Sequence, residues 1–148
     1  MTGVALAFRN LTVDPDDPVA TWPTEAVQTA LERGDLEHWH RLAVEIDNEP
    51  WGPTARQVEE VLGHSRPYGV AELMETVISR ARARAEQRER NEVAAEIRQA
   101  LVRSGLTRAQ FASRIGTSPS RLSTYLSSRV IPSATLLVRI RKLAPGRE

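Results

Sequence analysis

The amino-acid sequence predicts an all-α protein with a small acidic N-terminal helical bundle, a helical linker and a C-terminal helical domain. Apolar residues recur at helical spacing along most of the 148 residues. Ser, Thr, Asp and Pro stand where helices would begin, and Gly stands where they would end. Charge, finally, divides the chain into an acidic and a basic part, so two regions with different tasks are expected.

The net charge of +1 hides this division. Residues 1–79 contain fourteen Asp or Glu and five Arg, a net of −9, whereas residues 97–147 contain nine Arg, one Lys and no acid. Such asymmetry indicates that the basic end meets a polyanion, with nucleic acid as the favoured partner.

Composition also narrows the function classes. The chain has no Cys, so it has no disulfide framework and no zinc–thiolate site. It lacks an apolar run of the ~20 residues that a membrane span needs, and its first residues lack the features of a signal peptide. We therefore expect a cytoplasmic protein with no membrane contact.

The first region, residues 1–20, is predicted to be an extended arm or short strand. Its apolar residues alternate weakly before the sequence DPDDP breaks any regular structure. Those apolar residues are Val4, Leu6, Phe8, Leu11 and Val13.

Residues 21–82 are predicted to form an acidic helical interaction domain with three short helices at its start. The pair Pro23-Thr24 caps the first helix, which ends before Gly34. Asp35 caps the second, and Thr54 caps the third, which ends before Gly63. The inward faces comprise Val27, Ala30 and Leu31; then Leu36, Trp39, Leu42, Ala43 and Ile46; then Val58, Val61 and Leu62.

The aromatic and His residues of this domain are interpreted as structural. Trp39 and Trp51 are expected to be core anchors, the ordinary role of Trp at helical spacing. His38 and His40 are two residues apart and point to different helix faces, and neither they nor His64 has a Cys to help hold a metal. We predict no metal site and no cofactor.

A long helical pattern begins at Val70 and becomes strongly charged in residues 83–91, which are predicted to be a helical linker. Its arginines are expected to form a solvated face, supported by the pair Glu86 and Arg90 at i,i+4 spacing. The pattern alone leaves open whether residues 82–104 form one continuous helix.

Residues 92–148 are predicted to contain two short helices joined by a tight turn. Thr107 caps the sequence RAQFASRI, Gly116 permits a sharp turn, and Ser118 caps a second helix with Pro119 at its first position. This arrangement is a helix-turn-helix, whose second helix can enter the major groove of DNA. The second helix is expected to bury Leu122, Tyr125 and Leu126 and to expose Ser120, Arg121, Ser123 and Thr124.

Over residues 91–144 the chain resembles the Xre/Cro phage-repressor-like family of DNA-binding domains. The resemblance implies a compact bundle of about five helices, with residues 91–104 as the first and residues 133–143 as a later one. Arg108 stands where the family usually has Gln, and residues 126–128 lack the acidic residue and glycine common after the recognition helix. The matching residues are Gly105-Leu106-Thr107, Phe111-Ala112, Ile115-Gly116, Ser118, Ser120, Leu122-Ser123 and Pro132-Ser133.

The candidate DNA-binding residues fall into two groups by their chemistry. Hydroxyl side chains at helix N-termini and Arg side chains suit phosphates, whereas hydroxyls on the second helix can meet base edges. The phosphate group comprises Thr107, Arg108, Thr117, Ser118, Arg121 and Arg129, and the base-edge group comprises Ser120, Ser123 and Thr124. No catalytic constellation is found, so we expect no enzyme activity.

The sequence therefore favours a sequence-specific DNA-binding transcriptional regulator that acts as a repressor and as a homodimer on double-stranded DNA. Three roles remain open for the acidic region. It could dimerise the protein, since proteins of this kind bind two-fold sites. It could bind a protein, as in an antitoxin that neutralises a basic toxin and represses its own operon. Or it could sense a small effector, for which the sequence shows no pocket signature.

Overall fold

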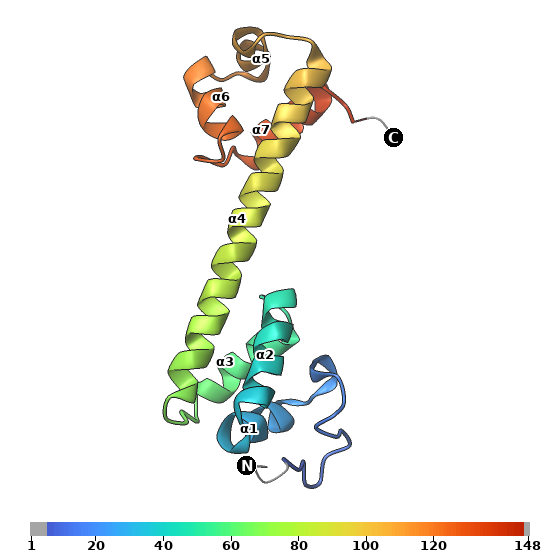
Figure 1. The fold of residues 1–148 in the computed structure, drawn as a ribbon. Helices are drawn as coiled ribbons and strands as arrows, with labels where there is room; N and C mark the ends of the chain where they lie inside the picture. The colour runs from blue at the N-terminus through green and yellow to red at the C-terminus, as the bar shows by residue number, and fades with distance from the viewer. Residues whose placement is uncertain (1–5, 147–148) are drawn as a thin grey trace. The chain divides into compact units, whose positions relative to one another are not determined.

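The computed structural model describes residues 6–146, and within this range the protein is all-helical, with no strand (Figure 1). The all-α prediction is thus confirmed. The elements in chain order are η1 (Val19–Thr21), α1 (Thr24–Arg33), α2 (Leu36–Asn48), α3 (Pro53–Leu62), α4 (Val70–Ser104), α5 (Arg108–Ile115), α6 (Pro119–Leu126) and α7 (Ala134–Leu143). None of the described helices is long and apolar enough to cross a membrane.

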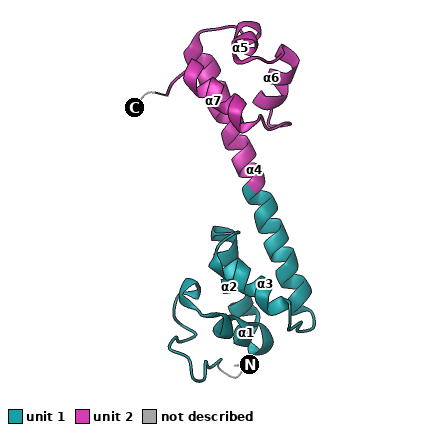
Figure 2. Ribbon diagram, turned by 180° about the vertical axis from the view of Figure 1, so that it is seen from behind, with its two compact units in different colours: residues 1–85 teal, residues 86–148 magenta. Residues whose placement is uncertain are grey.

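The chain divides into two compact units, residues 1–85 and residues 86–148, here called unit 1 and unit 2 (Figure 2). The division falls inside α4, which is one continuous helix of 35 residues. Residues 82–104 are therefore uninterrupted. Their helicity has a local cause, because α4 contains no Gly or Pro and its charged middle consists mostly of strong helix formers. Gly105, with φ 67°, follows the end of the helix.

The core of unit 1 is centred on Trp22, which is only 2% exposed. Its ring meets Phe8 edge-on at 5.1 Å between centroids, and its Nε1 donates to the Asp17 carbonyl at 3.1 Å. Arg41 lies over the same ring and donates to the carbonyls of Pro15 and Asp17. The other large fully buried residues of unit 1 are Val27, Leu31, Leu42, Ile46, Val58 and Met74.

The N-terminal segment is part of this packing. Residues 6–18 form turns and irregular backbone with no helix or strand. Leu6, Phe8, Leu11 and Val13 nevertheless pack against the unit 1 core. The predicted role of Val4 lies outside the described residues.

Two predicted core anchors have different outcomes. Trp39 packs against the core and donates from Nε1 to the Ala30 carbonyl at 2.9 Å. Trp51, in contrast, is 47% exposed, so its predicted core role is wrong. It lies in the turn before α3, where the Arg82 guanidinium covers its ring at 6.0 Å. Leu36, at the first position of α2, is also exposed although the pattern placed it inward.

The caps of the three short helices of unit 1 agree with the sequence prediction at most positions and differ at one N-cap. The N-cap of α1 is Pro23, the first residue of the predicted pair Pro23-Thr24. The N-cap of α3 is Gly52, so the cap predicted at Thr54 is wrong. In α3 the reason is that Pro53 takes the first helical position, which shifts the cap one residue earlier. The predicted cap at Asp35 is confirmed, with His38 completing its capping box. Gly34 and Gly63 are the C-caps, as predicted.

Unit 2 packs the second part of α4, α5, α6 and α7 around Phe111, which is fully buried. Within residues 86–146 these are four helices, where the resemblance implied about five. The N-caps predicted at Thr107 and Ser118 are confirmed, and Ser133 is the N-cap of α7. The remaining large fully buried residues of this core are Ile97, Ile115, Leu122 and Ile140.

Candidate nucleic-acid interface

Helix α5 begins with a complete capping box. The Thr107 hydroxyl accepts from the Gln110 backbone N–H at 3.2 Å, and Gln110 Oε1 accepts from the Thr107 N–H at 3.0 Å. The helix ends at Gly116, whose φ of 81° lies in the left-handed region that favours glycine. The Thr117 N–H then donates to the Ala112 carbonyl at 2.9 Å, which closes the turn toward α6.

Helix α6 starts on Ser118, whose Oγ accepts from the Arg121 N–H at 3.1 Å. Pro119 follows at the first helical position, where its fixed φ suits the helix and no N–H is missed. The Oγ atoms of Ser118 and Ser120 lie 3.3 Å apart. Because the cap uses a hydroxyl and not a carboxylate, no negative side chain stands at this N-terminus.

The two faces of α6 differ as the sequence predicts. Leu122, Tyr125 and Leu126 are buried in unit 2, whereas Ser120, Arg121 and Ser123 are exposed. Thr124 is half-buried, and its Oγ1 donates to the Arg121 carbonyl at 2.6 Å. The hydroxyl proton of Thr124 is thus engaged within the helix, which leaves its methyl group and its oxygen lone pairs for an outside contact.

The loop after α6 has an unusual residue at its start. Ser128 adopts φ 58°, a left-handed conformation usually taken by glycine. Its Oγ donates to Asn91 Oδ1 of α4 at 3.2 Å. Arg98, also on α4, donates from Nη1 to the Leu126 carbonyl at 2.6 Å. Ser128 therefore takes the left-handed position for which the family commonly has a glycine after the recognition helix. Its hydrogen bond to Asn91 of α4 stabilises this turn.

The Arg side chains of residues 97–146 fall into two sets. In the first set each guanidinium is engaged inside the unit: Arg98 on Leu126, Arg103 on Ala144, Arg139 on Ile115 and Arg141 on Glu96. In the second set the side chains are exposed and make no hydrogen bond or ion pair with the described residues. The second set, here called the free arginines, is Arg108, Arg114, Arg121 and Arg129.

Acidic residues lie away from this second set in the sequence. The described acids of unit 2 are Glu86, Glu89, Glu92 and Glu96, all on α4. Glu96 is paired with Arg141 at 2.7 Å, and this hydrogen bond lowers the pKa of the Glu96 carboxyl. From residue 97 to residue 146 no carboxylate side chain offsets the positive charge. The α5–turn–α6 region is thus suited to a phosphate backbone.

The structure connects some of the predicted site residues and separates others. Contacts link Ser118 to Ser120 and Arg121, Thr124 to Arg121, and the Arg129 N–H to the Thr124 carbonyl at 3.0 Å. The other predicted residues stand apart from this chain of contacts. Thr107 and Arg108 lie exposed at the start of α5, Thr117 is half-buried in the turn, and Ser123 is exposed on α6.

Sequence reasoning missed one residue of this region. Arg114 lies on α5 beside the buried residues Phe111 and Ile115 but is itself exposed. A signal was available, because Arg114 belongs to the acid-free segment and its helical position falls outside the apolar face of α5.

Comparison with known proteins agrees with this geometry. Residues 80–143 match the model of a family described as a helix-turn-helix domain, consistent with the Xre/Cro-like resemblance. The match covers all of α5, α6 and α7 but less than half of the chain. Neither a curated protein nor a solved structure matches the chain. A helix-turn-helix domain indicates a DNA-binding regulator.

Proposed function

We propose that this protein is a sequence-specific DNA-binding regulator that represses transcription. The observation that carries the proposal is the set of free arginines on and beside the helix-turn-helix, in a segment without carboxylates. The other arginines of residues 97–146 bond to carbonyls or to Glu96. Four exposed cations without an internal partner suit an external polyanion.

Helix α6 is the proposed recognition helix in the major groove. Ser120 and Ser123 are exposed and can donate to or accept from base edges, and the Thr124 methyl can meet a thymine methyl. Arg121 and Arg129 would neutralise phosphates on either side of the helix. The phosphate contacts would further include Thr107, Arg108, Thr117 and Ser118 at the starts of α5 and α6.

Short hydroxyl side chains make few strong base contacts, so recognition of one half-site is expected to be modest. Specificity would then depend on two copies binding two half-sites and on the shape of the DNA. In this proposal the protein works in the cytoplasm as a homodimer. Repression follows if its site overlaps a promoter, because the bound protein excludes polymerase.

The test is a fluorescence-anisotropy titration of labelled duplexes at several salt concentrations. The duplexes are the DNA upstream of the protein's own gene and a scrambled sequence of equal length. We expect tighter binding to the first, with log Kd rising linearly with log salt. Arg121→Ala should weaken binding to both duplexes and reduce the salt slope by about one, whereas Ser120→Ala should mainly reduce the preference between them.

Arg56→Ala is the matched control, because Arg56 is exposed in unit 1 and its side chain makes no hydrogen bond or ion pair with the described residues. It should leave both affinities unchanged. Salt-independent binding, or equal losses for Arg56→Ala and Arg121→Ala, would contradict the proposed interface. A promoter–reporter assay separates repression from activation, since added protein should lower the transcript level.

A second candidate function is an antitoxin that also represses its own operon. It is favoured by the charge of unit 1, whose fourteen acids and eight arginines give a net of −6. An acidic surface can attract a basic toxin. The check is co-expression with the product of the neighbouring gene: a complex that survives deletion of residues 105–148 would support it, and no complex would exclude that partner.

A further inference from the structure

Of the four free arginines, Arg129 is the one that lies outside a helix. Arg108 and Arg114 belong to α5 and Arg121 belongs to α6, so helical backbone fixes the point from which each side chain starts. Arg129 lies in the loop after α6 and is exposed. A loop that must become ordered on binding loses affinity, so the value of Arg129 to a DNA complex depends on what already fixes its backbone.

The backbone of Arg129 is fixed by the way in which α6 ends. The Arg129 N–H donates to the Thr124 carbonyl at 3.0 Å, and the Ser128 N–H donates to the Tyr125 carbonyl at 3.3 Å. These two bonds, with a left-handed residue between them, form a Schellman motif. The Val130 N–H adds a second bond to the Thr124 carbonyl at 3.2 Å. The motif requires the left-handed conformation that Ser128 adopts, with φ 58°.

Serine needs help to hold this conformation, because its Cβ crowds the backbone there and glycine has none. The help comes from α4. The Ser128 hydroxyl donates to Asn91 Oδ1 at 3.2 Å, and the same oxygen accepts from Gln87 Nε2 at 3.0 Å. Gln87 and Asn91 are four residues apart on one continuous helix, so the acceptor is itself held on rigid backbone.

We propose that Asn91 is a positioning residue for DNA binding. By holding Ser128 in its left-handed conformation, it keeps the backbone of Arg129 where the guanidinium can reach a phosphate. The inference rests on the proposed function, in which Arg129 neutralises a phosphate beside the recognition helix. Asn91 acts through Arg129 and needs no contact with DNA. A merely structural role would instead affect the stability of unit 2 and leave the contribution of Arg129 to binding unchanged.

The first experiment is a double-mutant cycle, measured on the full chain by the anisotropy titration. Asn91→Ala should weaken binding about fivefold, the factor that one ordinary hydrogen bond contributes to an equilibrium. The upstream and scrambled duplexes should lose alike, since a phosphate contact carries no sequence information. In an Arg129→Ala background the same substitution should have no effect, because the side chain that Asn91 positions is gone.

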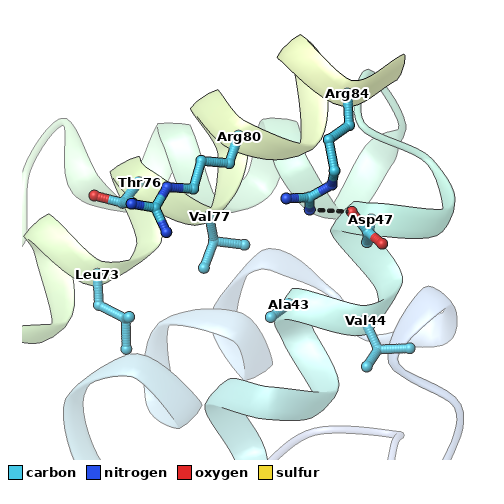
Figure 3. A pocket seen from close by; sticks show the side chains of 8 residues that line it. All are labelled: Ala43, Val44, Asp47, Leu73, Thr76, Val77, Arg80 and Arg84. Carbon is cyan, nitrogen blue, oxygen red and sulfur yellow. Dashed lines mark hydrogen bonds and ion pairs between the residues drawn. The ribbon is translucent and has the colours of Figure 1, made fainter. Parts of the chain in front are cut away.

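A control cycle uses Arg80, an exposed arginine of α4 in unit 1. Figure 3 shows Arg80 among the residues that line a groove between α2 and α4, where Arg84 pairs with Asp47. The Arg80 side chain makes no hydrogen bond or ion pair with the described residues. In an Arg80→Ala background Asn91→Ala should therefore keep its full effect. Gln99→Ala removes an exposed amide of α4 that has no described hydrogen bond, and it should leave the affinity unchanged.

The second experiment tests the backbone directly and needs no DNA. Hydrogen exchange followed by NMR reports how often the Arg129 and Val130 amides leave the Thr124 carbonyl. Asn91→Ala should speed the exchange of both amides about fivefold. Adding Ser128→Gly to Asn91→Ala should restore slow exchange and wild-type affinity, because glycine takes the left-handed conformation without a partner.

No loss of affinity in Asn91→Ala, or an equal loss with and without Arg129, would overturn the inference. Unchanged exchange in Asn91→Ala, or no rescue by Ser128→Gly, would overturn it as well. A wild-type chain without salt-sensitive DNA binding would overturn the proposed function and its phosphate contact. Faster exchange in Asn91→Ala would in that case still show that Asn91 fixes the backbone of Arg129.

Discussion

Arginine serves different purposes in the two units. In unit 1, Arg66, Arg82 and Arg84 pair with carboxylates of the same unit, and Arg41 lies over the Trp22 ring and donates to two backbone carbonyls. In unit 2 the engaged arginines mostly hold carbonyls at helix ends and loops, and the four free arginines around α5 and α6 hold nothing described. Arginines without an internal partner occur in unit 1 as well, Arg56 among them, but there they lie in an acidic unit, whereas no carboxylate lies between residues 97 and 146. The charge of the surrounding segment therefore says more about nucleic-acid binding than the number of arginines.

The largest expected effects are on stability, and they test whether each unit unfolds independently of the other. Trp22→Ala and Phe111→Ala should each cost about 3–5 kcal/mol, because each removes a buried aromatic side chain from one core. Hydrogen exchange followed by mass spectrometry should show lost protection mainly in the unit that carries the substitution. Binding to scrambled DNA should fail only with Phe111→Ala. Equal loss of protection in both units would show that the two cores unfold together. That result would contradict their treatment as independent units.

The next effect concerns the free arginine that sequence reasoning missed. Arg114→Ala should weaken binding to every duplex by up to about tenfold, the scale of one charge-assisted hydrogen bond to a phosphate. The salt slope should fall by about 0.9. The anisotropy titration measures both, and thermal unfolding should be unchanged because Arg114 is exposed. An unchanged slope would place Arg114 outside the interface.

An engaged arginine should behave differently. Arg98→Met removes the hydrogen bond to the Leu126 carbonyl at the end of α6 and should lower the free energy of unfolding by about 1 kcal/mol. It should also reduce the preference for operator over scrambled DNA, since the recognition helix loses a support, while the salt slope stays the same. Arg98→Lys should recover much of that preference. A slope lowered by about one would instead make Arg98 a phosphate contact.

A smaller effect is expected at the left-handed residue after α6. Ser128→Gly relieves a backbone cost of about 1 kcal/mol but removes a hydrogen bond of similar worth to Asn91, so stability should change by less than about 0.5 kcal/mol. Ser128→Ala loses the bond without the relief and should be clearly destabilising. Chemical denaturation measures both, and equal effects of the two changes would show that the hydrogen bond, and not the backbone, dominates.

The smallest effect concerns the ion pair between Arg141 and Glu96 in unit 2. The Arg141 guanidinium lowers the pKa of Glu96, so the pair stabilises the folded state above the ordinary Glu pKa of about 4.3 and this contribution is lost as pH falls through the lowered value. Arg141→Gln should raise the pKa of Glu96 toward its ordinary value, which a carboxyl NMR titration detects. An unmoved pKa would show that the pair does not persist in solution.

Local features of the fold could be predicted from the sequence. The caps at Asp35, Thr107 and Ser118 and the turn at Gly116 depend on residues only a few positions apart, so their patterns carry the information. The predicted cap at Thr54 was wrong because Pro53 takes the first helical position, which makes Gly52 the cap.

Long-range features could not be predicted. The burial of Trp22 and the exposure of Trp51 depend on which segments cover each ring, and Phe8 and Arg41 reach Trp22 from distant positions. Likewise, Arg98 and Arg129 are both arginines of the same basic segment, and the sequence does not distinguish their roles. Only the fold shows that Arg98 holds a carbonyl 28 residues away and that Arg129 does not.

The hydrogen bond between Ser128 and Asn91 has a consequence for how the DNA-binding part can be isolated. A fragment that begins at residue 92 keeps every residue of α5, α6 and α7 but lacks Asn91, the side chain that accepts from both Gln87 and Ser128. A fragment that begins at residue 86 retains both contacts. The shortest truncation that recognises its operator is therefore set by an amide partner on α4, several residues upstream of the first side chain of the Phe111 core.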